Sequence, residues 1–189
     1  MQDATRDFLS RGLTGMHVLE IGAWMGKMSA FFALLGAKVT GVDIDHDYTT
    51  RAREEAANWG VEDRMNFKVY DGDPPILPDN TYDLVFLNSA LLYQNDLEGL
   101  LRTLPHKMLK GGRVLFLENT LIGVLDEFFR SLAHLLRGEQ NYHYITEARI
   151  IAMERVLDLR VKILRKNAFQ CLNPSRTPRW WLLAGQKRA

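Results

Sequence analysis

Several features that place a chain in a particular class are scarce in this sequence of 189 residues. Cys171 is alone, so no intrachain disulfide can form and nothing indicates an oxidising compartment. No stretch approaches the roughly 18 uninterrupted apolar residues of a membrane helix, and the opening residues lack an export signal's charged and apolar regions. The net charge of +1 provides no general attraction to nucleic acid or membranes. These absences predict a cytoplasmic protein without membrane association.

Acidic residues are missing from positions 160–189. This segment nevertheless carries eight basic residues, namely Arg160, Lys162, Arg165, Lys166, Arg176, Arg179, Lys187 and Arg188. The composition is typical of the solvated faces of late strands, and the alternative interpretation is a weak preference for an anionic substrate.

The length and the ordinary hydrophobic content of 47% indicate one domain covering residues 1–189. Short apolar runs alternate with amphipathic segments, which predicts a parallel sheet covered by helices on both faces. Strands are expected at 17–21, up to 43, and at 65–70, 82–87, 113–117, 157–164 and 180–184. Helices are expected at 4–10, 27–35, 48–59, 97–108, 121–136 and 146–155. Gly36 and Gly60 end two of these helices, and Lys110-Gly111-Gly112 is predicted to be a turn.

The most informative feature is a glycine turn followed by an acidic residue at the end of the next strand. The strand that ends at Ile21 leads into Gly22-Ala23-Trp24-Met25-Gly26, and the following strand ends at Asp43. Glycine permits the tight turn and lets backbone N–H groups approach a ligand, while a carboxylate about 20 residues later can accept both ribose hydroxyls. This arrangement predicts a site for an adenosine-containing ligand. A nicotinamide dinucleotide is disfavoured, because pyrophosphate binding prefers a Gly-x-Gly-x-x-Gly turn.

Four motifs, in this order, resemble those of the class I S-adenosylmethionine-dependent methyltransferases. They are the turn with Asp43, the stretch Asp71-Gly72-Asp73 leading to residues 77–85, the turn at 109–113, and a last strand at 181–187. The resemblance implies a three-layer Rossmann-like α/β sandwich with a mostly parallel seven-stranded sheet and an antiparallel last strand. It also implies S-adenosylmethionine as methyl donor.

The resemblance also implies roles for individual residues. Glu20, Gly22, Ala23 and Gly26 would surround the methionine part of the cosubstrate, and Asp43 would accept the ribose hydroxyls. Asp71 and Gly72 would hold the adenine, and Asn88 would face the methionine amine and the transferring methyl group. Ile44 is a further implied cofactor-binding residue. Asp83 is interpreted as a structural acid.

Trp24 stands where the family most often has glycine. A large ring at this point could fill the site and disable it, but the turn resembles that of the small catechol and caffeoyl-type O-methyltransferases, which often carry an aromatic residue here. Those relatives hold a divalent metal, and Asn88, Glu118 and Asn119 occupy the corresponding positions. One carboxylate with two amides is a poor ligand set for Mg²⁺, so no metal is expected and this set is kept as an alternative.

The cosubstrate determines the chemistry that the residues must support. A sulfonium methyl group is already electrophilic, so the protein has to align a nucleophile with it and exclude water. A general base is optional, and the catalytic residues are not identified by the sequence. Glu118 is the candidate carried forward, with His143 and Tyr93 as alternatives.

The acceptor is expected to be a small molecule of aromatic or anionic character. Aromatic residues gather in segments outside the shared core, including a substrate-side segment at about 119–146. A nucleic-acid or protein methyltransferase is disfavoured, because no basic domain is appended and Asn88 is followed by Ser89-Ala90-Leu91 rather than by the Pro-Pro-aromatic sequence of base-modifying enzymes. A noncatalytic S-adenosylmethionine-binding domain is the third alternative.

Overall fold

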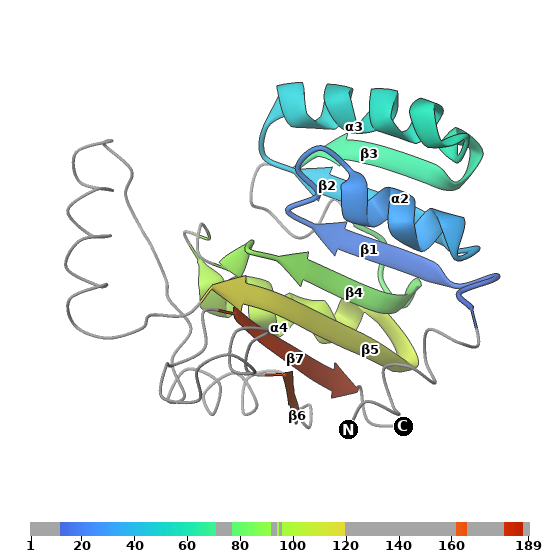
Figure 1. The fold of residues 1–189 in the computed structure, drawn as a ribbon. Helices are drawn as coiled ribbons and strands as arrows, with labels where there is room; N and C mark the ends of the chain where they lie inside the picture. Colours follow the sequence, from blue (N-terminus) through green and yellow to red (C-terminus); the bar gives the residue numbers. More distant parts are fainter. Residues whose placement is uncertain are drawn as a thin grey trace, which may run out of the picture.

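The computed structural model describes residues 12–70, 77–91, 94, 96–119, 162–165 and 180–186. The predicted helices at 4–10, 121–136 and 146–155 lie outside these residues. Within the described residues, every strand belongs to one sheet, in the order β3-β2-β1-β4-β5-β7-β6. Figure 1 shows this twisted sheet with helices packed against it.

Five neighbouring strands of the sheet are parallel. They are β3 (Met65–Val69), β2 (Lys38–Asp43), β1 (His17–Ile21), β4 (Tyr82–Asn88) and β5 (Met108–Asn119). The antiparallel strand β7 (Trp180–Gln186) follows β5, and β6 (Lys162–Arg165) pairs with β7 at the edge. The mostly parallel sheet predicted from the alternation of apolar runs is therefore confirmed.

Helices cover both faces of the sheet. The helices α2 (Lys27–Leu34) and α3 (His46–Trp59) connect the strands β1, β2 and β3, with the short 3₁₀ helix η1 (Glu62–Arg64) before β3. On the opposite face, α4 (Leu97–Lys107) connects β4 to β5. Because successive strand residues point to opposite faces, β1 contributes Val18 to the core under α2, and Leu19 and Ile21 to the core under α4.

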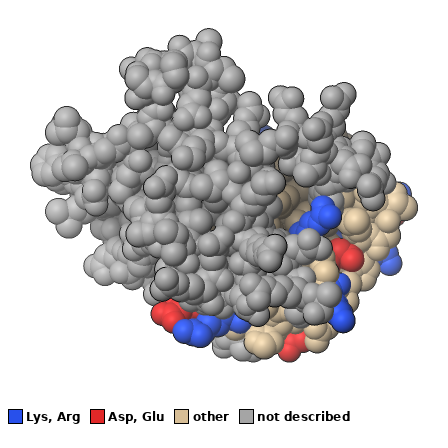
Figure 2. Space-filling model, turned by 90° about the horizontal axis from the view of Figure 1, so that it is seen from below, with Lys and Arg blue, Asp and Glu red and all other residues tan. Residues whose placement is uncertain are grey.

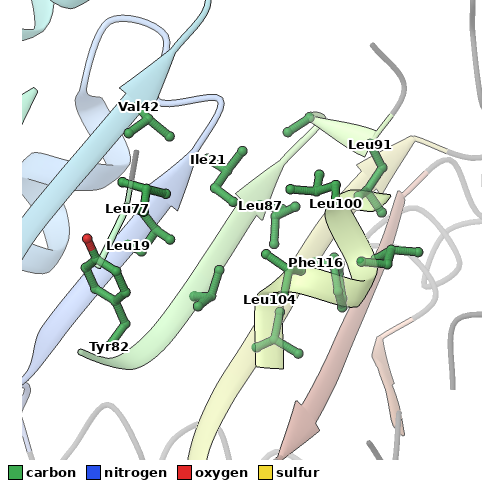
Figure 3. Packing of buried hydrophobic residues seen from close by; sticks show 14 of the residues in the cluster. Leu19, Ile21, Val42, Leu77, Tyr82, Leu87, Leu91, Leu100, Leu104 and Phe116 are labelled. Atoms are coloured by element: carbon green, nitrogen blue, oxygen red, sulfur yellow. The ribbon is translucent and has the colours of Figure 1, made fainter. Parts of the chain in front are cut away.

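The larger core lies between the sheet and α4 (Figure 3). Leu100, Leu101 and Leu104 of α4 pack against Leu19, Ile21, Leu87 and Phe116 of the central strands, and all of these side chains are buried. Burial of each such side chain contributes about 1.5–3 kcal/mol relative to an exposed one, so this core holds the strand order in place.

The helix ends follow the local chemistry of the sequence. At the end of α2, Gly36 has a φ of +98°, its N–H donates to Ala33 O, and the N–H of Ala37 donates to Phe32 O. These two bonds form a Schellman motif, in which glycine avoids the strain of the left-handed conformation. At the start of α3, the side chain of Asp45 accepts a hydrogen bond from Asp47 N at 2.7 Å. This cap begins the helix at His46, two residues earlier than predicted.

The predicted turn at Lys110-Gly111-Gly112 needs a correction, because the structure places these residues inside β5. The ladder is nevertheless interrupted there, since Tyr82 pairs with Met108 and Leu84 pairs with Arg113. One residue of β4, Asp83, thus lies opposite the four residues 109–112 of β5, and Gly111 has a φ of +80°. The glycines produce a bulge within a strand rather than a loop between elements.

Lys107, at the end of α4, binds the segment 77–81 that leads into β4. Its buried ammonium donates to Leu77 O at 2.7 Å and to the carboxylate of Asp79 at 2.7 Å. The backbone adds bonds from Thr81 N to Lys107 O and from Asn80 N to His106 O. A buried lysine with these partners joins α4 to the start of β4 and supports the register of the sheet.

None of the helices in the described part of the chain combines the length and the apolar character that membrane crossing requires.

Candidate functional site

Three of the predicted site residues, Gly22, Asp43 and Asn88, are brought together at the carboxyl ends of the central strands. Ile21 pairs with Val42 on one side and with Leu87 on the other. The residues that follow these three are Gly22, Asp43 and Asn88, so they lie at one level along the sheet edge. The strand order reverses between β1 and β4, and ligands of open α/β sheets bind at the carboxyl edge next to such a reversal.

The turn after β1 is tied to the end of β2 by backbone hydrogen bonds. The N–H groups of Gly22 and Ala23 both donate to Val42 O, at 2.9 and 3.0 Å. Gly22 has a φ of +77°, and a Cβ atom there would lie 3.0 Å from the Cβ of Ala90. The turn therefore fits closely against the segment that follows β4, and glycine is required at this approach.

Asp43 joins the turn to the start of α3 through its carboxylate. One oxygen accepts a hydrogen bond from Trp24 N at 2.7 Å, and the other accepts one from Asp45 N at 3.1 Å. The side chain is 8% exposed. Each carboxylate oxygen has two acceptor positions, so Asp43 retains capacity for the two hydroxyls of a ribose.

Trp24 adopts a left-handed conformation with a φ of +47°, which explains why glycine is the usual residue here. Its indole ring is half exposed and meets the ring of Tyr48 on α3 edge to face, with 6.1 Å between the centroids. The ring thus leans toward the first turns of α3. Sequence reasoning identified Trp24 but not Tyr48, because no local pattern relates the two residues.

Glu20 is buried at 1% exposure on the face of β1 that α2 covers. The hydroxyl of Ser29, itself fully buried, donates to its carboxyl group in a short hydrogen bond. Burial raises the pKa of Glu20 to about 8, and the neighbouring charge of Asp43 acts in the same direction, while the bonds from Ser29 oppose the change. A pKa of about 8 favours the protonated form of Glu20 at neutral pH.

Glu20 makes the stability of the fold depend on pH. The folded protein retains a proton that the unfolded chain releases, so the contribution of neutral Glu20 is complete below pH 4.5 and is lost as the pH rises through about 8. We expect the urea midpoint of E20Q to fall less between pH 5 and pH 9 than that of the parent. The exposed control E54Q should follow the parent profile. Parallel curves for E20Q and the parent would show that Glu20 is charged in the folded state.

The other predicted residues divide into three groups. Ile44 follows Asp43 and is 64% exposed at the same edge of the sheet. Asp71 and Gly72, together with His143 and Tyr93, lie outside the described residues. Glu118 and Asn119 end β5, directly after Leu117, which pairs with Asn88, so their backbone reaches the same edge. The described residues include no group of three His, Cys, Asp or Glu side chains able to hold a metal ion.

Ser29 is the site residue that sequence reasoning missed. It lies on α2 among the buried residues Ala30, Phe32 and Ala33, nine positions after Glu20. A small polar residue within an otherwise apolar buried face was the available signal, but its partner is visible only in the folded chain. Asp83, interpreted as a structural acid, accepts a hydrogen bond from His17 N at 2.9 Å at the opposite edge of the sheet.

A separate hollow of about 240 Å³ lies beside the outer strand β3. Its lining residues come from α3, η1 and β3, namely Arg53, Ala56, Glu62, Met65, Asn66 and Phe67. None of them belongs to the predicted site. The hollow is shallow, so the edge formed by Gly22, Asp43 and Asn88 remains the candidate site.

Comparisons with known proteins agree with this geometry. The family model described as "Methyltransferase domain" matches residues 19–116, more than half of the chain. The chain therefore belongs to the class I S-adenosylmethionine-dependent methyltransferase family, as its motifs predicted. The matched region runs from β1 into β5 and contains the turn, Asp43 and Asn88.

Curated relatives share less than a third of their residues with the chain. Methyltransferase GfsG of Streptomyces halstedii is 26% identical over 60% of this chain and 41% of its own length. The sterol 4-C-methyltransferase strm-1 of Caenorhabditis elegans is 29% identical over 64% of this chain and 37% of its own length. The ubiquinone/menaquinone biosynthesis C-methyltransferase UbiE of Cronobacter sakazakii is 29% identical over 55% of this chain and 43% of its own length. The chain thus spans about two fifths of the length of these relatives.

Solved structures share the fold. The YcgJ protein of Bacillus subtilis superposes with a TM-score of 0.79 at 17% identity, with both chains fully covered. An S-adenosylmethionine-dependent methyltransferase of Mesorhizobium loti gives 0.74 at 18% identity over 96% of both chains. A phosphoethanolamine N-methyltransferase of Haemonchus contortus, solved with S-adenosyl-L-methionine, gives 0.72 at 17% identity over 93% of this chain and 49% of its own. The Rossmann-like fold is confirmed, whereas the finer likeness to catechol O-methyltransferases stays a prediction.

Proposed function

We propose that this protein transfers the methyl group of S-adenosylmethionine to a small-molecule acceptor by in-line displacement. The observation that carries the proposal is the meeting of the glycine turn and the Asp43 carboxylate where the strand order reverses. In the proposed complex, Asp43 accepts the ribose hydroxyls, Ile44 contacts the adenine, and Gly22, Ala23 and Gly26 bring backbone close to the methionine part. Asn88, half-buried at the same level, faces the methionine amine and the methyl group.

The charge of the site supports a cationic ligand. The Asp43 carboxylate lies against the turn, where it accepts a hydrogen bond from Trp24 N, and none of the ion pairs among the described residues includes Asp43 or Glu20. A pyrophosphate would be repelled by this arrangement, whereas a sulfonium and an ammonium group would be attracted. The charge therefore favours S-adenosylmethionine over a nicotinamide dinucleotide.

The named relatives support a small acceptor with a nucleophilic carbon. Two of them are C-methyltransferases, one of sterols and one of ubiquinone and menaquinone biosynthesis. We propose that the acceptor is aligned near the carboxyl ends of β4 and β5, where Asn88 and Glu118 lie, and that Glu118 is the candidate base. The described surface visible in Figure 2 carries lysine, arginine, aspartate and glutamate together rather than one sign alone, so it provides no support for a nucleic-acid acceptor.

Calorimetric titration followed by a transfer assay tests the proposal. The protein should bind both S-adenosylmethionine and S-adenosylhomocysteine, and it should transfer labelled methyl groups to at least one compound in a panel of phenols, quinols, amines and carboxylates. Absence of binding by both nucleosides would overturn the proposal. Binding without transfer to any acceptor class would instead identify a noncatalytic S-adenosylmethionine-binding domain.

A further inference from the structure

Two acidic side chains stand near the carboxyl ends of adjacent strands, at the edge of the sheet where the cosubstrate is proposed to bind. Glu20 is the second-last residue of β1 and is 1% exposed, and Asp43 is the last residue of β2 and is 8% exposed. Two negative charges at this depth oppose each other and lose hydration, which is costly unless one of them is neutralised. A proton on Glu20, whose pKa burial raises to about 8, would provide this neutralisation.

Among the described residues, the elements packed around Glu20 supply no positive charge to it. Its strand partners are Gly41 on β2 and Phe86 on β4. From α2 it receives the hydroxyl of Ser29, while Lys27 of that helix is exposed. The residues that α3 buries are Thr49, Ala52 and Ala56. The charged group that acts on Glu20 is thus Asp43, which has the same sign.

We propose that Glu20 is a proton-releasing positioning residue, which loses its proton when the cationic cosubstrate binds above it. The inference rests on the proposed function, because the sulfonium and ammonium groups supply the positive charge. With that charge in place, the carboxylate of Glu20 is stabilised by the ligand and by Ser29, and the proton passes to the solvent. Binding of the donor is therefore coupled to pH, and the site distinguishes a cationic donor from its neutral product.

The product S-adenosylhomocysteine provides the matched comparison, because it differs from the donor by the methyl group and the sulfonium charge. Calorimetry at pH 7 in buffers of different ionisation enthalpy measures the protons released on binding. We expect S-adenosylmethionine to release up to about one proton and S-adenosylhomocysteine clearly less. Below pH 8, the affinity for the donor should rise by up to about tenfold per pH unit, and the affinity for the product should rise less steeply.

Two variants assign the proton to Glu20. E20Q carries no titratable group and should abolish the difference in proton release between the two ligands. S29A removes the hydroxyl that stabilises the carboxylate, so it should move the rise in donor affinity to higher pH. If both nucleosides bind but release equal numbers of protons, or if E20Q releases as many as the parent, the inference is wrong while the proposed function stands. If neither nucleoside binds the parent protein, both the inference and the proposed function are wrong.

Discussion

Replacing Asp43 with alanine is expected to weaken S-adenosylmethionine binding by about 30- to 1000-fold. A hydrogen bond to a charged group contributes about 1.5–3 kcal/mol, and two bonds to one carboxylate do not add fully, so the expected loss is about 2–4 kcal/mol. The structure adds a second reason, because the same carboxylate holds Trp24 N and Asp45 N and thereby shapes the turn. Calorimetric titration of the folded variant measures the change.

D83A is the matched control for this prediction. Asp83 is also a strand aspartate that accepts a backbone hydrogen bond, from His17 N, but it lies near the amino end of β4, away from the ligand edge. Its removal should leave the affinity unchanged within about twofold. A second variant, D43N, keeps the size of the side chain and an acceptor oxygen for one of the two backbone donors, and it removes the negative charge, so it measures how much of the loss in affinity comes from that charge. Unchanged affinity in a folded D43A protein would show that ribose binds elsewhere.

Replacing Gly26 with alanine is expected to destabilise the fold by about 2–5 kcal/mol. Gly26 precedes α2 with a φ of +75°, a conformation that costs an L-residue about 1–2 kcal/mol. A Cβ atom there would also lie 2.9 Å from the Cβ of Ala52 and 3.0 Å from the ring of Phe67. Relief of this overlap requires α2 and α3 to separate, which adds about 1–3 kcal/mol. Urea denaturation at constant pH measures the loss.

Gly60 provides the control that separates backbone strain from steric overlap. It ends α3 with a φ of +65°, but a Cβ atom there would meet nothing within 4 Å. G60A should therefore lose only the backbone contribution of about 1–2 kcal/mol. Equal losses in G26A and G60A would contradict the tight packing of the turn against α3 and β3.

Local chemistry made much of the fold predictable from the sequence. β1 was predicted with its observed bounds, and the end of β2 at Asp43 was also correct, because buried parallel strands are short apolar runs between polar breaks. Gly36 and Gly60 marked helix ends, because each has the positive φ that favours glycine. The turn at 110–112 was wrong as a separate element, because the glycines there form a bulge that depends on the partner strand β4.

The candidate site was predictable in part for the same reason. Gly22 follows a recognisable strand, and Asp43 and Asn88 end two others. Parallel strands end at a common edge, so the meeting of these residues followed from the chain order. The sequence did not predict three contacts between residues on different elements. These are the ring contact between Trp24 and Tyr48, the hydrogen bond from Ser29 to Glu20, and the hydrogen bond from Lys107 to Leu77 O.

The sequence by itself thus determined the class of fold and the edge of the sheet at which Gly22, Asp43 and Asn88 meet, because these depend on periodicity, glycine conformation and the direction of strands. Only the tertiary structure decided that Glu20 is buried against Ser29 and close to Asp43, and that its pKa rises to about 8. The ionisation of a carboxyl group depends on the hydration it loses and the charges around it, and residues far apart in the chain determine both.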